Sequence, residues 1–189
     1  MGFMNSFVLN LIVVTLGVLI ALIIDNWKEK RRNKSFLRKA FKVVKEEIEG
    51  NRKQVKDALD SHKKLFENLK DKVKDENEAL EDFIHEGLEA DELNIPGIKK
   101  GVGIRYFIGN HADLVDQKLI FQLSDIEVVT EYFDKKVELL MNHIFDRFHS
   151  RLSSDKKKFL ALLGNVISSE NQLLLLYNRF LEQEYLKNI

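Results

Sequence analysis

The feature that most constrains this chain is an uncharged apolar run of eighteen residues near its start, Phe7 to Ile24 (FVLNLIVVTLGVLIALII). As a helix this run would span about 27 Å, close to the roughly 30 Å hydrocarbon core of a bilayer. A buried core helix this apolar would need a larger core than the rest of the chain can supply. A secretory signal would carry its basic residues before the run and a cleavage site after it. We therefore predict a transmembrane helix, with residues 1–27 as an N-terminal membrane anchor.

The residues that follow the run predict its orientation. No Lys or Arg precedes the run, and five lie within the ten residues after it. The positive-inside rule then places the N-terminus outside and the rest of the chain in the cytoplasm, as in a single-pass protein of the inner (plasma) membrane. Trp27 stands where an aromatic ring anchors a helix end at the membrane surface. Together with Lys28, Lys30, Arg31 and Arg32, it forms the predicted interfacial anchor.

Small and polar residues recur along one face of the predicted span. Asn10, Val14, Gly17 and Ala21 follow one another at steps of four, three and four, which places them on one side of a helix. Small residues let two spans approach closely, and an Asn can hydrogen-bond to its equivalent in a neighbour. This face then packs the spans of a homo-oligomer or lines a narrow pore. The spacing also arises easily by chance, so both interpretations stay open.

The composition predicts a helical protein. Lys and Arg together number 30, as do Asp and Glu, and 44% of residues are hydrophobic, with one Pro and nine Gly. This composition favours helices over β-structure or disorder. A net charge of zero argues against nucleic acid as the main partner. The absence of Cys excludes disulfides, thiolate metal sites and cysteine nucleophiles, and it suits a reducing compartment.

Residues 28–92 form the second predicted segment, a basic flank followed by a long amphipathic or coiled-coil helix. Its apolar residues alternate at steps of four and three over nearly five heptads: Leu37, Phe41, Val44, Ile48, Val55, Ala58, Leu65 and Leu69. Asn51 and His62 occupy positions in phase with this stripe. Such residues can fix the register of helix packing, or act as a pH sensor, or simply be polar residues that a long helix tolerates. We expect the helix to continue from the span without a break and to end between Glu86 and Asn94, where Gly87 weakens the stripe.

Residues 93–112 form a Gly-containing connector that begins with Asn94-Ile95-Pro96-Gly97. Within it, Gly101 and Gly103 lie near Lys99, Lys100 and Arg105, the ingredients of an anion-binding loop. The loop lacks the third Gly of a dinucleotide site and the Gly-Lys-Ser/Thr of a phosphate loop. We favour a short helix or hairpin here and keep the three basic residues as a possible anion or ligand contact.

Residues 113–189 predict two further helices. The first begins at Asp113 or Asp116 and runs to about Ser150, and Ser153-Ser154-Asp155 can cap the second. The apolar run from Leu173 to Leu176 is too short for a second span. The predicted fold is therefore all-α, with these helices packed antiparallel against the long one in a cytoplasmic bundle.

A search for catalytic groups yields no candidate site. His143 and His149 are six residues apart, a spacing that does not bring two imidazoles to one helix face as four residues would. No Ser lies in a nucleophile-elbow context, and no thiol is present. We expect no enzymatic activity, no cofactor and no metal.

The span and its flank also carry a resemblance. The run LGVLIALIIDNWKEKR, from Leu16 to Arg31, resembles the opening of a family of small, uncharacterised bacterial single-span membrane proteins. The stretches Asp113 to Ile126 and Leu173 to Tyr177 are similar to their later helices. Where those proteins carry Trp-Glu-Ala, this chain has Gly103-Ile104-Arg105-Tyr106. The resemblance implies a membrane anchor with a cytoplasmic helical domain of unknown function, and it supplies no catalytic residue.

Three function hypotheses follow from the sequence. The first is a membrane-anchored, homo-oligomeric helical protein that acts as an interaction or signal-sensing module, with the lipid bilayer, its own copies and a further protein as partners. The second is a small oligomeric channel or membrane-disrupting effector gated by the cytoplasmic part. The third is an effector that binds a phosphorylated molecule through the loop from Lys99 to Arg105.

Overall fold

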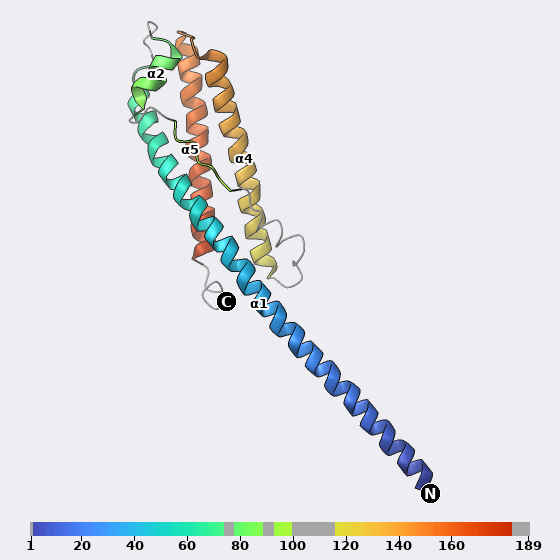
Figure 1. Cartoon of the computed structure of the whole chain (residues 1–189). Coiled ribbons are helices and arrows are strands. Elements are labelled where there is room, and N and C mark those ends of the chain that lie inside the picture. Colours follow the sequence, from blue (N-terminus) through green and yellow to red (C-terminus); the bar gives the residue numbers. More distant parts are fainter. Residues whose placement is uncertain (1, 74–77, 89–92, 100–115, 183–189) are drawn as a thin grey trace. The chain divides into compact units, whose positions relative to one another are not determined.

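The computed structural model describes residues 2–73, 78–88, 93–99 and 116–182, and side chains from residue 14 onward (Figure 1). Four helices are described: α1 (Gly2–Leu69), α2 (Leu80–Gly87), α4 (Gln117–Arg147) and α5 (Ser153–Leu181). The described residues contain no strand, and the all-α class is confirmed. The chain divides into two compact units, one up to Lys42 and one from Val43 to Asn188.

The first unit consists of the N-terminal part of α1. Every described side chain from Val14 to Arg32 is exposed. The chain continues as helix through Gly50 and Asn51 to Leu69, so the predicted uninterrupted helix is confirmed over that range.

In the second unit, the rest of α1 contributes one apolar stripe. From Val44 on, the predicted stripe residues lie in the core with at most 2% of their surface exposed: Val44, Ile48, Val55, Ala58, Leu65 and Leu69. Asn51 and His62 are buried in the same phase. The steps of three and four that predicted the stripe therefore identify the buried face, as expected for helices that pack along heptad positions.

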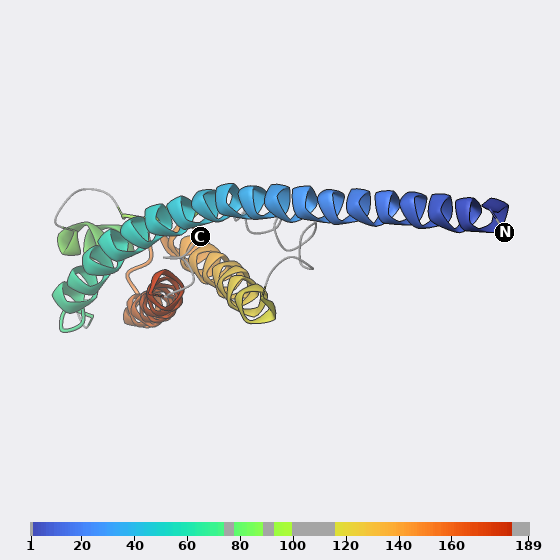
Figure 2. The same cartoon turned by 90° about the horizontal axis from the view of Figure 1, so that it is seen from below.

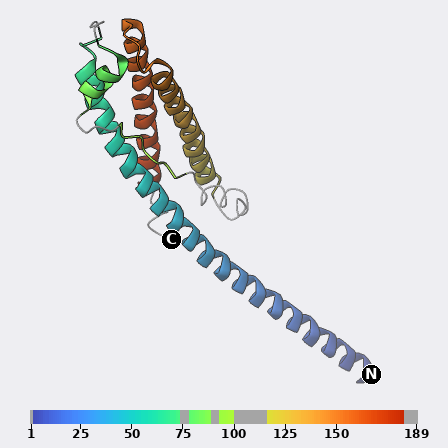
Figure 3. The ribbon, with the colours of Figure 1, turned by 45° about the horizontal axis from the view of Figure 1, so that its top comes forward.

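Helix α5 lies beside both α1 and α4 (Figures 2 and 3). Arg52 Nη1 of α1 donates to Asn178 Oδ1 of α5 at 3.3 Å, and His62 lies 2.8 Å from Glu170, so the two helices run in opposite directions. A short turn joins α4 to α5, which also run antiparallel. Helices α1 and α4 consequently run in the same direction, so the predicted antiparallel orientation relative to α1 is wrong for α4. The reason is that the chain returns along α1 through residues 93–99 before α4 begins.

The long helix stops earlier than expected. It ends at Leu69, and a separate helix, α2, follows from Leu80 to Gly87. The backbone N–H of Leu80 donates to the carbonyl of Ser150 at 2.8 Å, which ties α2 to the α4–α5 turn. A Cβ at Gly87 would lie 2.6 Å from Leu65 Cδ1 and from Leu69 Cγ. Gly87 therefore permits close packing of α2 against α1. Because the chain turns back after α1, the apolar side chains of α2 are buried, whereas a straight continuation of α1 would leave them in water.

The starts of α4 and α5 differ in their capping. Asp116 Oδ1 accepts the N–H of Lys118 at 2.9 Å, so α4 begins at the later of its two predicted starts, and Asp113 lies outside the described residues. At α5, the Ser150 hydroxyl donates to Asp155 Oδ2 at 2.6 Å and accepts the N–H of Leu152 at 3.3 Å. The N-cap residue of α5 is Leu152, and no side chain caps the helix, so the predicted capping by residues 153–155 is wrong. The Ser150 hydroxyl instead links the Asp155 carboxylate to the backbone before the helix.

By length and composition, one helix found among the described residues, Ser153–Leu181 (α5), is apolar enough to cross a membrane. A core helix of a water-soluble protein passes the same test. Ten of its side chains are buried, and two of these, Lys156 and Glu170, are charged residue types.

Candidate functional site

The predicted packing face of the span falls on the first unit. Val14, Gly17 and Ala21 are exposed on α1, and a Cβ at Gly17 would meet no atom within 4 Å. Asn10 lies in the helix, but its side chain is outside the described part. This face is thus available for contact with a second span, and its use stays a prediction.

The predicted interfacial anchor combines an aromatic ring with cations. The Arg31 guanidinium carbon lies 5.6 Å from the centroid of the Trp27 ring, within the range of a cation–π interaction. Lys28 and Arg32 line the same surface hollow as these two residues, and Lys30 is exposed. A ring flanked by cations on one helix face is the arrangement that suits a membrane surface with anionic headgroups.

The candidate anion contact is described only at Lys99. Its backbone N–H donates to Asn51 Oδ1 at 3.0 Å, and Asn51 Nδ2 donates to the Lys99 carbonyl at 3.1 Å. Lys100 and Arg105 lie outside the described residues. The paired hydrogen bonds explain why a buried Asn interrupts the stripe of α1: its amide holds the extended segment 93–99 against the helix.

His62 and Glu170 form a buried pair between α1 and α5. His62 Nδ1 lies 2.8 Å from Glu170 Oε1, and the two side chains are 2% and 0% exposed. Burial raises the pKa of Glu170, and the hydrogen bond and charge of His62, together with the charge of Lys63, partly offset the increase. A lone carboxylate is costly at this depth, so the hydrogen bond to His62 offsets part of the cost of burying Glu170.

A second polar layer joins three helices. The Tyr177 hydroxyl of α5 lies beside Thr130 of α4 and Asn51 of α1. The Thr130 hydroxyl donates to the Ile126 carbonyl at 2.7 Å. Burial raises the pKa of Tyr177 to about 12, although Thr130 and Asn51 act in the opposite direction. Tyr177 therefore stays neutral over the physiological range.

Lys156 is fully buried near the α2 end of the second unit. Its Nζ lies 3.4 Å from Glu78 Oε2 and 5.1 Å from the centroid of the Phe83 ring. The partly exposed carboxylate and the ring face supply the negative potential that a buried ammonium requires.

The two histidines considered as metal ligands have other contacts. His143 Nε2 lies 2.9 Å from the carbonyl oxygen of Asp155, and exposed His149 lies 3.4 Å from Glu81. No group of three potential metal ligands occurs within the part of the chain that the structure describes.

The sequence did not lead us to expect the two buried charged residues of α5. Lys156 and Glu170 are in phase with the apolar residues Phe159, Leu163, Val166, Leu173 and Phe180. The available signal was the same as for His62, a charged residue at a heptad core position. Two such residues on different helices can neutralise each other, but the sequence alone does not pair them.

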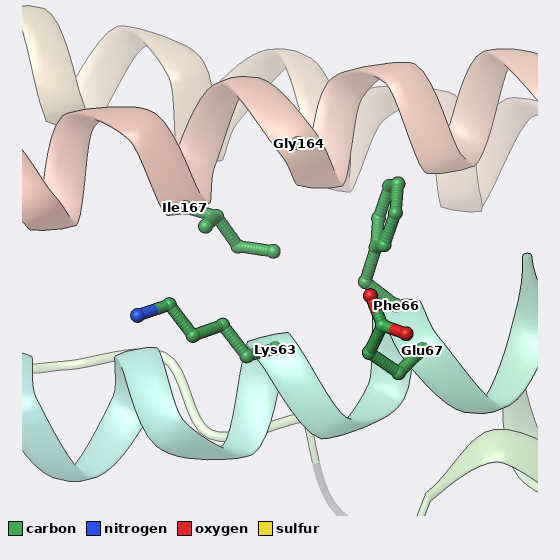
Figure 4. A pocket seen from close by; sticks show the side chains of 5 residues that line it. All are labelled: Lys63, Phe66, Glu67, Gly164 and Ile167. Carbon is green, nitrogen blue, oxygen red and sulfur yellow. The ribbon is translucent and has the colours of Figure 1, made fainter.

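A pocket of about 350 Å³ lies between α1 and α5 (Figure 4). Lys63, Phe66 and Glu67 line it from α1, and Gly164 and Ile167 line it from α5. The Phe66 ring points toward Gly164, where a Cβ would lie 3.7 Å from the ring, and Lys63 and Glu67 place opposite charges along its α1 side. The volume is at the lower limit for small-molecule sites, and few polar groups converge on it.

No protein-family model, no characterised protein and no solved structure matches this chain.

Proposed function

We propose that this chain is a single-pass membrane-anchored helical protein that acts as a homo-oligomeric interaction or signal-sensing module. Residues 7–24 lie in the inner membrane, the N-terminus faces outward, and the helices from Val43 onward form a bundle at the cytoplasmic face. Its partners are the lipid bilayer, further copies of the chain and a protein that the bundle contacts.

The observation that carries this proposal is the exposure of the aliphatic side chains of α1. Eight large aliphatic residues between Val14 and Ile24 are 46–67% exposed, and they lie on all sides of the helix. Water-soluble monomers rarely expose a contiguous apolar surface of this kind. An apolar helix followed by Trp27 and basic residues is the pattern of a span that ends at a cytoplasmic interface.

The second unit supports the proposed role as an interaction module. Two buried polar contacts join its elements: His62 with Glu170, and Asn51 with the backbone of Lys99. These pairs fix how the helices and the extended segment fit together, which is a structural role. The buried pair of His62 and Glu170 is also where a change in protonation would act on the packing.

Topology can be tested with single cysteines, since the natural chain has none. We expect a membrane-impermeant maleimide to label Ser6→Cys on intact spheroplasts. Ser154→Cys and Glu182→Cys, at the two ends of α5, should react only after the membrane is opened. Opposite labelling of the two α5 positions would mean that α5 is the span and would refute the proposed topology.

Insertion can be tested with paired arginine substitutions. An Arg at the centre of a span costs about 2.5–3.5 kcal/mol. The double variant Leu19→Arg, Ile20→Arg should therefore move the protein from the carbonate-washed membrane to the supernatant. Leu175→Arg, at an exposed position of α5, is the matched control and should leave the protein in the membrane. The reverse outcome would refute the proposal.

A further inference from the structure

Helix α4 carries a second set of large apolar side chains, outside the core. Phe121, Val128, Tyr132 and Leu139 are 50–64% exposed. Asp125 and Lys135, also exposed, complete a row whose members follow one another at steps of four, three, four, three and four. We call this row the outer stripe: Phe121, Asp125, Val128, Tyr132, Lys135 and Leu139.

The outer stripe has the spacing of a helix-packing seam. The buried residues of α4, among them Leu119, Leu123, Ile126, Thr130 and Phe133, follow the same alternation of three and four on another face. A helix with two apolar faces at heptad spacing is typical of a helix with neighbours on both sides. Among the described residues of the second unit, the helices that pack against α4 cover its core side, and the outer stripe is exposed, so it is available for another helix.

The outer stripe is chemically complementary to a second copy of itself that runs in the opposite direction. If two copies of α4 lie antiparallel with a two-fold axis at the level of Thr130, Phe121 of one copy faces Leu139 of the other. In the same register, Val128 faces Tyr132, and Asp125 faces Lys135. Every apolar residue then meets an apolar residue and every charge meets its opposite, each twice, as a two-fold symmetric interface requires.

A parallel arrangement lacks this match. In a parallel pair in register, Asp125 faces Asp125 and Lys135 faces Lys135, so two layers bring like charges together. We propose that the outer stripe of α4 is a homodimer interface in which a second copy of this chain packs antiparallel, with two Asp125–Lys135 ion pairs that set the register.

This interface is separate from the predicted packing face of the span and does not depend on the membrane anchor. Since α1 and α4 run in the same direction, an antiparallel pair has its two Val43 residues at opposite ends. Both anchors of such a pair enter the inner membrane of the proposed topology when the paired bundles lie along the membrane surface. The test uses the full chain in detergent, which leaves the pairing of the α4 helices free of that constraint.

Charge exchange tests the register. Asp125→Lys and Lys135→Asp each place like charges in both polar layers, and we expect each to weaken dimerisation at least tenfold by light scattering over a concentration series. The exchanged double variant Asp125→Lys, Lys135→Asp should restore the dimer. Lys157→Glu, at an exposed position of α5, is the control and should have no effect. Circular dichroism of each variant verifies that it is folded.

Cysteine cross-linking tests the direction. A mixture of Val128→Cys and Tyr132→Cys chains should form a disulfide between the two kinds of chain, and each alone should form little. A disulfide between two Val128→Cys chains would mean a parallel pair and would overturn the inference. The proposed interface would also be refuted if the protein were a monomer at every concentration. It would likewise be refuted if Gly17→Leu were the one substitution among those tested that changed the mass of the oligomer. These outcomes leave the maleimide topology result intact, so failure here is distinguishable from failure of the proposed membrane anchor.

Discussion

The pair of His62 and Glu170 gives the sharpest prediction about stability. Both side chains are almost completely buried, and their polar atoms are 2.8 Å apart. The substitution His62→Leu keeps a similar apolar volume but leaves the Glu170 carboxyl alone in the core. Removing one partner of a buried pair costs about 3–5 kcal/mol. A domain of this size has a total stability of about 5–15 kcal/mol, so the single substitution should remove a large fraction of it.

The double variant His62→Leu, Glu170→Leu separates the pair from its surroundings. It leaves no charge to be buried, and apolar replacements of buried ion pairs are often neutral or stabilising. We therefore expect the double variant to be more stable than His62→Leu alone and close to the natural chain. The matched control is the exposed pair of Lys45 and Glu49, at 3.8 Å and with 47% and 51% of the side chains exposed. Lys45→Gln should cost no more than about 0.5 kcal/mol.

The assay is urea unfolding of the full chain in detergent at pH 7, followed by circular dichroism. The free energies of unfolding of the natural chain, of His62→Leu, of Glu170→Leu and of the double variant give the coupling energy between His62 and Glu170. The reasoning would be refuted if His62→Leu cost less than about 1 kcal/mol, the lower limit for an unpaired buried polar group. It would also be refuted if the double variant were less stable than His62→Leu.

Three further predictions concern stability. Burial raises the pKa of Glu170, so its carboxyl stabilises the fold most at a pH below its unfolded pKa of about 4.5. This stabilisation is lost as the pH rises through the pKa of the folded state. The variant Glu170→Gln should therefore show a weaker pH dependence of the free energy of unfolding above pH 4.5. Gly87→Ala should lower the free energy of unfolding by about 1–3 kcal/mol because its Cβ would clash, whereas Gly50→Ala should raise it by about 0.5–1 kcal/mol; urea titrations of both variants would reveal a wrong sign. Phe159→Ala in the core should cost about 3–5 kcal/mol and Leu175→Ala at the surface less than about 0.5 kcal/mol, and similar thermal midpoints would contradict the assignment of the core.

The helical stripes could be predicted from the sequence because one physical rule decides them. A residue at a heptad core position is buried whether it is Val55 or His62, since the position and not the side chain determines the face. For this reason the sequence alone predicts the buried positions of Asn51 and His62. The partners come from other helices, and which helix faces which depends on the folded arrangement.

The end of α1 could not be predicted for a related reason. The helical spacing continues weakly from Leu69 toward Leu80, and nothing local forces a break between them. What favours the break is the burial of α2 against Leu65 and Leu69 through Gly87, a contact between distant residues. The glycine that weakens the helical stripe in the sequence is therefore a position of close contact between two helices.

Composition alone does not decide between α1 and α5 as the helix that crosses the membrane. The burial of charged side chains on α5 favours α1. Helix α5 is apolar enough to cross a membrane, yet its Lys156 and Glu170 are fully buried against Glu78 and His62. Moving α5 into a bilayer would separate both pairs and leave two charged groups in hydrocarbon, at several kcal/mol each. The segment from Val14 to Ile24 has no charged residue and no covered side, so the same transfer removes only apolar surface from water. The balance of these two terms favours α1 as the anchor and α5 as a core helix.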